Sequence, residues 1–203
     1  SMEYGVQGIP AVKAFQDGMV VDEFVGAQPE SRVRAFLNRV APGEDELFAD
    51  EIETLLEELA WSEAEETLRD AAPSPIVSLG LAKALLGQGE GCEAKELLEN
   101  IVDASVYSEA QRLIPLANYL CEFYGEEDKS ELDSIEMQYR HAAELMRRDN
   151  IEAALDGLLE VLRADKRYRK GEVRDVIVAI FALLGDHNPL TRRYRSELAL
   201  ILF

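Results

Sequence analysis

The sequence predicts a mainly α-helical protein in which pairs of helices repeat, preceded by a short β-hairpin and one further helix. From about residue 44 onward, apolar residues recur at helical spacing, and Gly and Pro fall almost entirely between the apolar segments. Small and apolar residues also return at a fixed spacing along this part of the chain. Residues 1–40 differ, because they hold two β-prone runs. We therefore expect two domains, residues 1–42 and residues 43–203.

The two β-prone runs are residues 11–15 and 20–25, and Asp17-Gly18 lies between them. Such a dipeptide favours a tight hairpin turn, since Gly accepts a positive φ at no steric cost. Pro29-Glu30-Ser31 then suits the first turn of a helix. Such a unit cannot bury two sheet faces alone, because two strands are marginal by themselves. The exposed strand edge predicts self-association of the chain.

This first segment resembles the C-terminal half of a thioredoxin domain. The resemblance rests on residues 4–10 (YGVQGIP), 15–18 (FQDG) and 24–27 (FVGA). It implies that the peptide bond between Ile9 and Pro10 is cis and faces a redox centre. The WCxxC motif of that family lies in its N-terminal half, which has no counterpart in this sequence. We therefore do not expect the chain as given to be an oxidoreductase.

An internal repeat organises the remainder of the sequence. It is anchored on Ala64, Ala94 and Ala154, which lie 30 and 60 positions apart. Each anchor has a small or branched residue twelve positions before it, an apolar pair nine and eight positions before it, and a Leu four positions after it: Ile52, Leu55, Leu56 and Leu68; Ala82, Leu85, Leu86 and Leu98; Ala142, Leu145, Met146 and Leu158. A period near 30 to 34 residues built from two helices is typical of degenerate tetratricopeptide repeats. A plain helical bundle with coincidental spacing is the alternative.

Turns between the paired helices are expected at residues 60–63, 87–91 and 148–150. Between the second and third repeats, residues 105–124 read as one long helix that Pro115 kinks. The other expected segments are a charged turn at 125–129, a helix at 130–147, a largely buried helix at 171–184, a break at 185–189 and a terminal helix at 190–203.

Charge and hydropathy exclude several classes of partner. The 21 basic and 40 acidic residues give a net charge of −19, which disfavours nucleic acid as a partner. Residues 41–130 carry 22 acidic and 5 basic side chains and predict a solvated acidic surface. The longest apolar run, residues 176–184, is too short to span a membrane. No basic-then-apolar leader follows Met2, so a signal peptide is not expected.

No motif supports catalysis, a cofactor or a metal ion. Cys92 and Cys121 lack CxxC spacing and suit a reducing cytoplasm better than a disulfide scaffold. His141 is expected on a helix surface and His187 in a turn, and neither forms a zinc-type pattern with the cysteines. Gly87, Gly89 and Gly91 give GxGxG without a preceding strand, which predicts a helix-to-helix turn rather than a phosphate loop. We expect no enzyme.

Two features near the C-terminus are candidates for binding a partner. The first is a basic cluster, whose alternatives are pairing with the chain's own acidic residues or docking of an acidic partner. Its members are Arg163, Lys166, Arg167, Arg169, Lys170, Arg174, Arg192, Arg193 and Arg195. The second is an apolar tail, which either caps the last repeat or meets a partner groove. Its members are Leu198, Leu200, Ile201, Leu202 and Phe203.

The order of a thioredoxin-like segment followed by degenerate tetratricopeptide repeats resembles the bacterial YbbN family, also called CnoX or chaperedoxins. Residues 183–185 (LLG), 189–190 (PL), 193–195 (RYR) and 198–203 (LALILF) strengthen this resemblance. It implies a holdase-type chaperone or co-chaperone in the stress response, which passes unfolding clients to chaperonin or Hsp70 machinery. The alternatives are a thiol–disulfide oxidoreductase in the intact protein, acting in cell redox homeostasis, or a scaffold adaptor that binds one specific peptide.

Overall fold

The computed structural model describes residues 8–16, 18–40, 44–124 and 133–202. The chain divides into two compact units, residues 1–51 (unit 1) and residues 52–203 (unit 2). The division falls inside helix α2 (Glu44–Glu57), nine residues beyond the boundary between residues 42 and 43 that we expected. The expected turn at 125–129 lies outside the described residues.

Unit 1 contains the expected hairpin and helix. Strands β1 (Ala11–Gln16) and β2 (Met19–Val25) pair antiparallel, from Ala11 opposite Val25 to Gln16 opposite Met19. The register shifts by one residue after Ala14, which is the geometry of a β-bulge. The bond between Ile9 and Pro10 is cis, the isomer that the thioredoxin resemblance implies.

Helix α1 (Glu30–Val40) packs on β2 through an edge-to-face contact between Phe24 and Phe36, whose ring centroids are 5.0 Å apart. Phe36 is the one buried hydrophobic residue among the described side chains of unit 1. The sheet that the described residues form has two strands, so the packing of this unit is thin.

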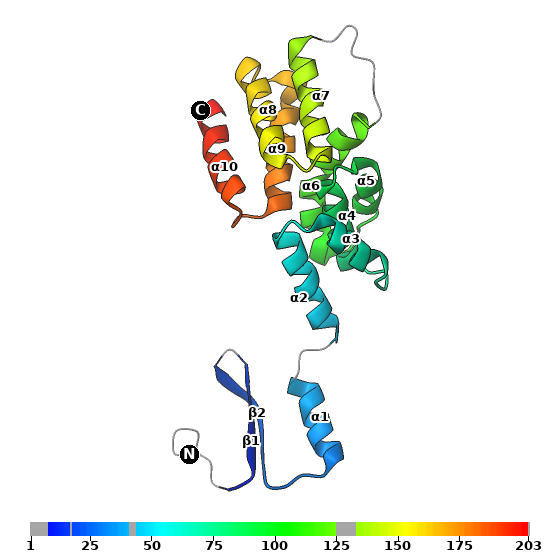
Figure 1. The fold of residues 1–203 in the computed structure, drawn as a ribbon, viewed down its shortest axis with the longest axis vertical. Coiled ribbons are helices and arrows are strands. Elements are labelled where there is room, and N and C mark those ends of the chain that lie inside the picture. Colours follow the sequence, from blue (N-terminus) through cyan, green and yellow to red (C-terminus); the bar gives the residue numbers. More distant parts are fainter. Residues whose placement is uncertain (1–7, 17, 41–43, 125–132, 203) are drawn as a thin grey trace. The chain divides into compact units, whose positions relative to one another are not determined.

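Unit 2 is a stack of helices, with α10 at its C-terminal edge against α8 and α9 (Figure 1). The helices that follow α2 are α3 (Trp61–Arg69), α4 (Pro75–Gly87), α5 (Gly91–Glu99), α6 (Ala104–Glu122), α7 (Ser134–Arg147), α8 (Ile151–Ala164), α9 (Glu172–Leu184) and α10 (Pro189–Leu202), with a short 3₁₀ segment η1 (Tyr168–Gly171) before α9. Side-chain caps fix several helix starts: the Ser74 hydroxyl accepts a bond from the Val77 N–H, and the Asp133 carboxylate accepts one from Glu136.

Most of the predicted repeat positions lie in the core of unit 2. The anchors Ala64, Ala94 and Ala154 are fully buried. The Leu four residues after each anchor and the small or branched residue twelve before each one are buried as well. Small side chains at these positions let paired helices approach closely, which is the packing reason for the repeat. The tetratricopeptide-like, mainly α fold predicted from the sequence is confirmed.

The three turns between paired helices share one backbone geometry. The residue five positions before each anchor has a left-handed conformation: Leu59 (φ 59°), Gly89 (φ 81°) and Asp149 (φ 55°). The next residue donates its N–H to the carbonyl of the Leu nine positions before the anchor, as Ala60 to Leu55, Glu90 to Leu85 and Asn150 to Leu145. This is the Schellman bond that ends a helix. The first two turns are shorter than expected, since α3 already begins at Trp61 and α5 at Gly91, whereas the third spans the expected residues 148–150.

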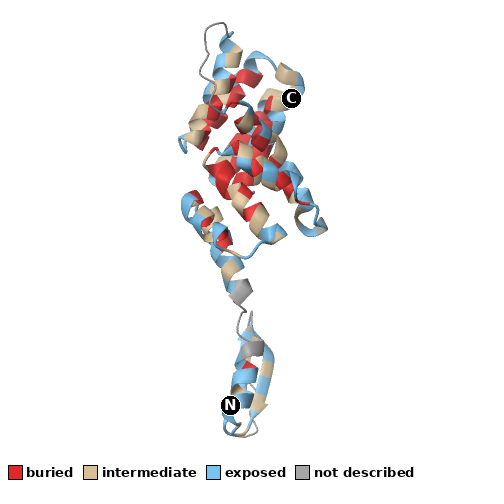
Figure 2. Ribbon diagram, turned by 90° about the vertical axis from the view of Figure 1, so that its right-hand side faces the viewer, coloured by how far each residue is buried: buried red, intermediate tan, exposed pale blue. Residues whose placement is uncertain are grey.

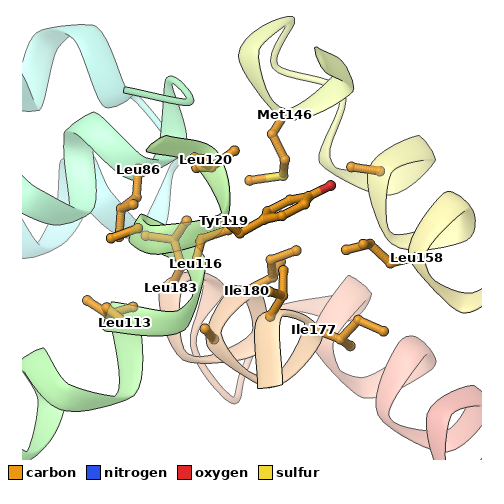
Figure 3. Close-up of a cluster of buried hydrophobic side chains, with 14 of the residues drawn as sticks. Leu86, Leu113, Leu116, Tyr119, Leu120, Met146, Leu158, Ile177, Ile180 and Leu183 are labelled. Carbon is orange, nitrogen blue, oxygen red and sulfur yellow. The ribbon is translucent and has the colours of Figure 1, made fainter. Parts of the chain in front are cut away.

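The segment between the second and third repeats departs from simple stacking. The predicted long helix forms as α6 and continues through Pro115. It packs on α5 and on α9, which is far away in the sequence, while α7 pairs with α8. Figure 3 shows the core at this junction, where side chains of α6, α7, α8 and α9 meet around Tyr119. The Tyr119 hydroxyl donates to the Tyr139 carbonyl at 2.6 Å, so its burial leaves no unpaired donor.

Candidate partner-binding surfaces

The predicted basic cluster splits into paired and unpaired members. Arg169 lies in η1, half-buried, and its guanidinium bonds to Glu122 at 2.7 Å and to Glu136 at 3.1 Å. It also stacks over the rings of Phe123 and Tyr139, 5.2 and 5.1 Å from their centroids. Arg169 thereby joins α6, α7 and η1. Because its guanidinium is occupied inside the chain, the prediction that Arg169 binds a partner is corrected.

Backbone conformation supports this internal role of Arg169. Arg169, Lys170 and Gly171 have φ values of 46°, 58° and 96° in succession. The first two are unfavourable for residues with a Cβ and cost of order 1 kcal/mol each. The contacts of Arg169 with two carboxylates and two aromatic rings offset this cost. A run of basic residues in a sequence carries no signal of such a backbone, so the role was not predictable.

The polar groups around Arg169 shift one another's titration. Burial and the hydrogen bond to Glu136 raise the pKa of Tyr168 to about 12. Burial alone would raise the pKa of Glu136, but the Tyr168 hydroxyl and the Arg140 and Arg169 guanidinium groups lower it below its ordinary value. Glu136 is therefore charged at neutral pH and acts as the central acceptor of this network.

The other basic residues follow two patterns. Arg193 pairs with Glu152 at 2.7 Å and Arg195 with Asp186 at 2.6 Å, both near the surface. Arg192 lies 3.5 Å from a ring nitrogen of the exposed His187. Within the cluster, Lys166, Arg167 and Lys170 are exposed and have neither an ion pair nor a side-chain hydrogen bond to another described residue. They are the members of the cluster that remain open to a partner.

The predicted apolar tail is mainly a cap on unit 2. Leu198 is buried, and Ile201 and Leu202 are half-buried against the core. Leu200 points away, with 83% of its side chain exposed. Phe203 lies outside the described residues. Of the two interpretations of the tail, the structure favours capping. The prediction that Leu198 docks a partner is corrected accordingly.

The two cysteines form a disulfide in the structure, which corrects the expectation of free thiols. Cys92 in α5 and Cys121 in α6 have Cα atoms 4.5 Å apart. Their 29-residue separation hid this proximity from a search for CxxC spacing. The bond fastens the second repeat to α6, and it removes the argument for a reducing compartment that we drew from cysteine usage.

The GxGxG segment is a turn, as predicted, but its glycines have a packing role that the sequence did not reveal. A Cβ on Gly87 would lie 2.2 Å from Cδ2 of the Trp61 indole. A Cβ on Gly89 would lie 2.5 Å from Cγ of Arg147, and one on Gly91 would lie 2.5 Å from Cβ of Leu120. The three glycines, at alternating positions, thus let residues of α3, α7 and α6 pack closely against one short turn.

These contacts bring the three turns of the repeats together along one edge of unit 2, which we call the turn edge. It holds an open depression of about 430 Å³, lined by Leu59, Ala60, Trp61, Ser62, Glu63, Gly87, Gln88, Glu90, Arg147 and Asp149. Glu63, Glu90 and Asp149 are exposed and have no side-chain partner among the described residues. The Glu65 carboxylate beneath them accepts bonds from Gln88 and Arg69. The turn edge is a polar surface with unpaired negative charge.

Two side chains that line this depression carry buried donors. The Trp61 Nε1–H and the Arg147 Nε–H have no acceptor among the described residues. A buried donor without an acceptor costs about 1–3 kcal/mol. Both groups are donors only, and another nitrogen of the Arg147 guanidinium donates to the Phe123 carbonyl. Composition and periodicity gave no signal of this site.

The described part of the chain also shows where metal binding and the two histidines stand. Within it no group of three His, Cys, Asp or Glu side chains is placed to hold a metal ion. His141 is exposed on α7, 3.5 Å from Glu144, and His187 lies in the turn before α10, as the sequence predicts. None of the described helices is long and apolar enough to cross a bilayer.

The fold of unit 2 is that of helical repeat proteins of the tetratricopeptide type, a class whose members commonly bind other proteins. Comparison with known proteins agrees, since residues 126–203 match a family model described as tetratricopeptide repeat. An uncharacterized protein of Haemophilus influenzae is 22% identical over 218 aligned positions, which cover 99% of this chain and 98% of that protein. The similarity therefore extends through unit 1 as well as unit 2.

Proposed function

We propose that this protein is a holdase-type chaperone or co-chaperone, which binds apolar stretches of unfolding proteins and keeps them soluble. Protein binding follows from the tetratricopeptide-like fold. The chaperone role, transfer of clients to chaperonin or Hsp70 machinery, and a cytoplasmic location follow from the YbbN resemblance. No catalytic step is part of this proposal.

One observation carries the proposal: unit 1 exposes a concentration of large apolar side chains. Its described residues include Ile9, Val12, Phe15, Met19, Val20, Val21, Val25, Leu37 and Leu47, each at least 39% exposed. Contiguous exposed apolar surface marks a site of protein interaction. The excess of acidic side chains in residues 41–130 would keep a complex with a client in solution, because complexes of like charge repel one another. The apolar tail contributes less than we expected, because the core covers most of it.

The experiment is suppression of aggregation. A heat-unfolded client is followed by light scattering while the full chain is added at increasing ratio. We expect suppression near equimolar ratio, and we expect the triple variant Met19→Ser, Val21→Thr and Val25→Thr to need several-fold more protein. The matched control replaces exposed apolar residues of unit 2, with Val102→Thr and Leu200→Gln. Equal activity of both variants would exclude unit 1 as the client surface. Failure of the folded parent protein to suppress aggregation would overturn the holdase proposal.

A further inference from the structure

We propose that Cys92 and Cys121 form a reversible redox switch, whose disulfide closes under oxidising conditions and locks α5 to α6. The inference rests on the cytoplasmic location that belongs to the proposed function. In a reducing compartment a protein disulfide is usually transient and serves redox sensing or thiol chemistry. The dithiol form of the chain is then its resting state, and the bonded form described above is its oxidised state.

The packing around the pair keeps the two cysteines adjacent whether or not the bond is present. A Cβ on Gly91, the residue before Cys92, would lie 2.6 Å from the backbone nitrogen of Cys121, so the backbones of α5 and α6 meet at this point. Leu98 of α5 and Leu120 of α6 are fully buried in one core. Closing the bond therefore needs no movement of the helices, and the two thiols react as a positioned pair.

A second tie holds the same junction and involves no sulfur. The Arg147 guanidinium, at the end of α7, donates to the Phe123 carbonyl just after α6. A Cβ on Gly89 would lie 2.7 Å from Cα of Arg147, so this residue also contacts the turn before α5. In the dithiol state the Cys92 S–H has an acceptor, because its Sγ lies 3.6 Å from the Cys121 carbonyl oxygen. The junction thus stays assembled when the bond is open.

The pair is within reach of small molecules in solution. Cys92 and Cys121 are both half-buried rather than sealed in the core. Disulfides that solvent can reach are the labile and regulatory ones. The chain has two cysteines in all, so no third thiol competes for either sulfur. Exchange with a low-molecular-weight thiol and its disulfide is therefore the chemistry that the pair allows.

The reaction balances in two exchange steps. One cysteine thiolate attacks a sulfur of the low-molecular-weight disulfide, the bond between its two sulfurs breaks, and one thiolate leaves and takes up a proton. The second cysteine then loses its proton and attacks the sulfur of the first, which releases the other small thiol. The two cysteines are oxidised by two electrons and the small disulfide is reduced to two thiols. Reduction of the switch is the reverse sequence.

The closed bond acts on the stability of unit 2. It ties the first turn of α5 to the last turn of α6, which restricts the unfolded chain and favours the folded state. A holdase has to stay folded under the stress that unfolds its clients. Oxidation of this pair would strengthen the chain under the conditions in which clients accumulate.

The first experiment sets the thiol state of the full-length protein with buffers of reduced and oxidised glutathione, and counts free thiols by alkylation and mass. We expect two free thiols at a strongly reducing ratio and none at an oxidising ratio, with full return when the buffer is reversed. Circular dichroism is expected to show the same helix content in both states. A bond that stays closed in the reducing buffer would identify a permanent disulfide and overturn the proposal, as would thiols that stay free in the oxidising buffer.

Single variants test whether the sulfurs can be reached. Cys92→Ser and Cys121→Ser each leave one thiol without its partner, so at least one of them is expected to gain the mass of one glutathione in the oxidising buffer. The parent chain is expected to gain none, because its second thiol displaces the adduct. The control, with both cysteines replaced by Ser, takes up none. Two single variants that remain unmodified while folded would contradict the exchange mechanism.

The last measurement locates the effect and connects it with function. Amide hydrogen exchange in α5 and at the end of α6 is expected to slow at least tenfold in the bonded form, while exchange in α1 of unit 1 stays unchanged. Equal exchange in both forms would mean that the bond locks nothing, against the proposal. Suppression of client aggregation is measured in parallel. A reversible bond in a chain without holdase activity defeats the proposed function alone, whereas a holdase whose bond never opens defeats this inference alone.

Discussion

Unit 1 and unit 2 contain similar proportions of apolar residues but bury them to very different extents. In unit 2 the buried positions run through every helix from α3 to α10, whereas in unit 1 they are nearly absent (Figure 2). Each helix of unit 2 packs on neighbours from the adjoining repeat, so each apolar stripe finds a partner. The two-stranded sheet of unit 1 has one helix to pack against. The difference shows that a periodic apolar pattern produces a core only where enough layers exist to cover it.

The largest expected effect is the loss of a core side chain from unit 2. Leu116 is fully buried at the α6 junction (Figure 3), so Leu116→Ala removes transfer energy and leaves a cavity, at a cost of about 3–5 kcal/mol. The control is Leu37→Ala in unit 1, where the side chain is 52% exposed and the cost is about 1 kcal/mol or less. Urea unfolding followed by circular dichroism measures both. Equal costs would contradict the contrast between the units.

The disulfide adds to the difference in stability between the two units, because both of its cysteines lie within unit 2. Closing the loop between Cys92 and Cys121, 29 positions apart, stabilises the folded state by up to about 3.5 kcal/mol in the chain-entropy account. Replacing both cysteines by Ser is expected to lower the melting temperature of unit 2 and to make it insensitive to a thiol reductant. Thermal unfolding with and without dithiothreitol tests this. A parent protein that melts at one temperature under both conditions would argue against the bond.

A third effect is electrostatic and depends on pH. The folded-state pKa of Glu136 is below its ordinary value of 4.5, so its charge stabilises unit 2 above that pH, and the contribution is lost as pH falls through the folded-state pKa. Glu136→Gln is expected to cost about 1–2 kcal/mol at pH 7 and progressively less as the pH falls through the folded-state pKa of Glu136. The control, Glu99→Gln, breaks an exposed pair with Lys95 and is expected to cost about 0.5 kcal/mol or less. Urea unfolding at several pH values separates the two.

The smallest effect in free energy is the association of unit 1 with a second copy of the chain. Its exposed strand edges and apolar side chains favour pairing between chains. Light scattering over a concentration series is expected to give a mass rising above the 22.7 kDa of one chain. Val21→Lys, at a residue 49% exposed beside the bulge, is expected to return the mass toward that of one chain. A strict monomer at high concentration would show that the edge is protected.

Sequence reasoning succeeded where structure follows from local pattern. The hairpin around Gly18, the start of α1 after Pro29 and the buried anchors Ala64, Ala94 and Ala154 were all predicted, because turn chemistry and helical periodicity act over a few residues. The paired helices of the repeats follow from the same signals. The acidic character of the middle region was evident from composition alone.

What sequence reasoning missed depends on contacts between distant residues. The pairing of α6 with α9 spans the whole third repeat, and neither helix carries a local sign of it. Cys92 and Cys121 meet only because α5 and α6 pack closely at Gly91. The basic run at residues 166–170 reads as one charged cluster, yet the left-handed backbone at Arg169 turns that single side chain inward. Such roles are assigned by tertiary packing rather than by residue type.

The three-glycine turn has a consequence for how this chain tolerates mutation. Positions 87, 89 and 91 each meet a different helix and exclude a Cβ, while positions 88 and 90 between them line the open depression and accommodate a side chain. Random mutagenesis would therefore record alternating intolerant and permissive positions, the signature usually read as a β-strand. In this protein that alternation marks a junction of helices. An alignment of related sequences would show the same alternation, and secondary-structure inference from it would assign a strand where the chain has none.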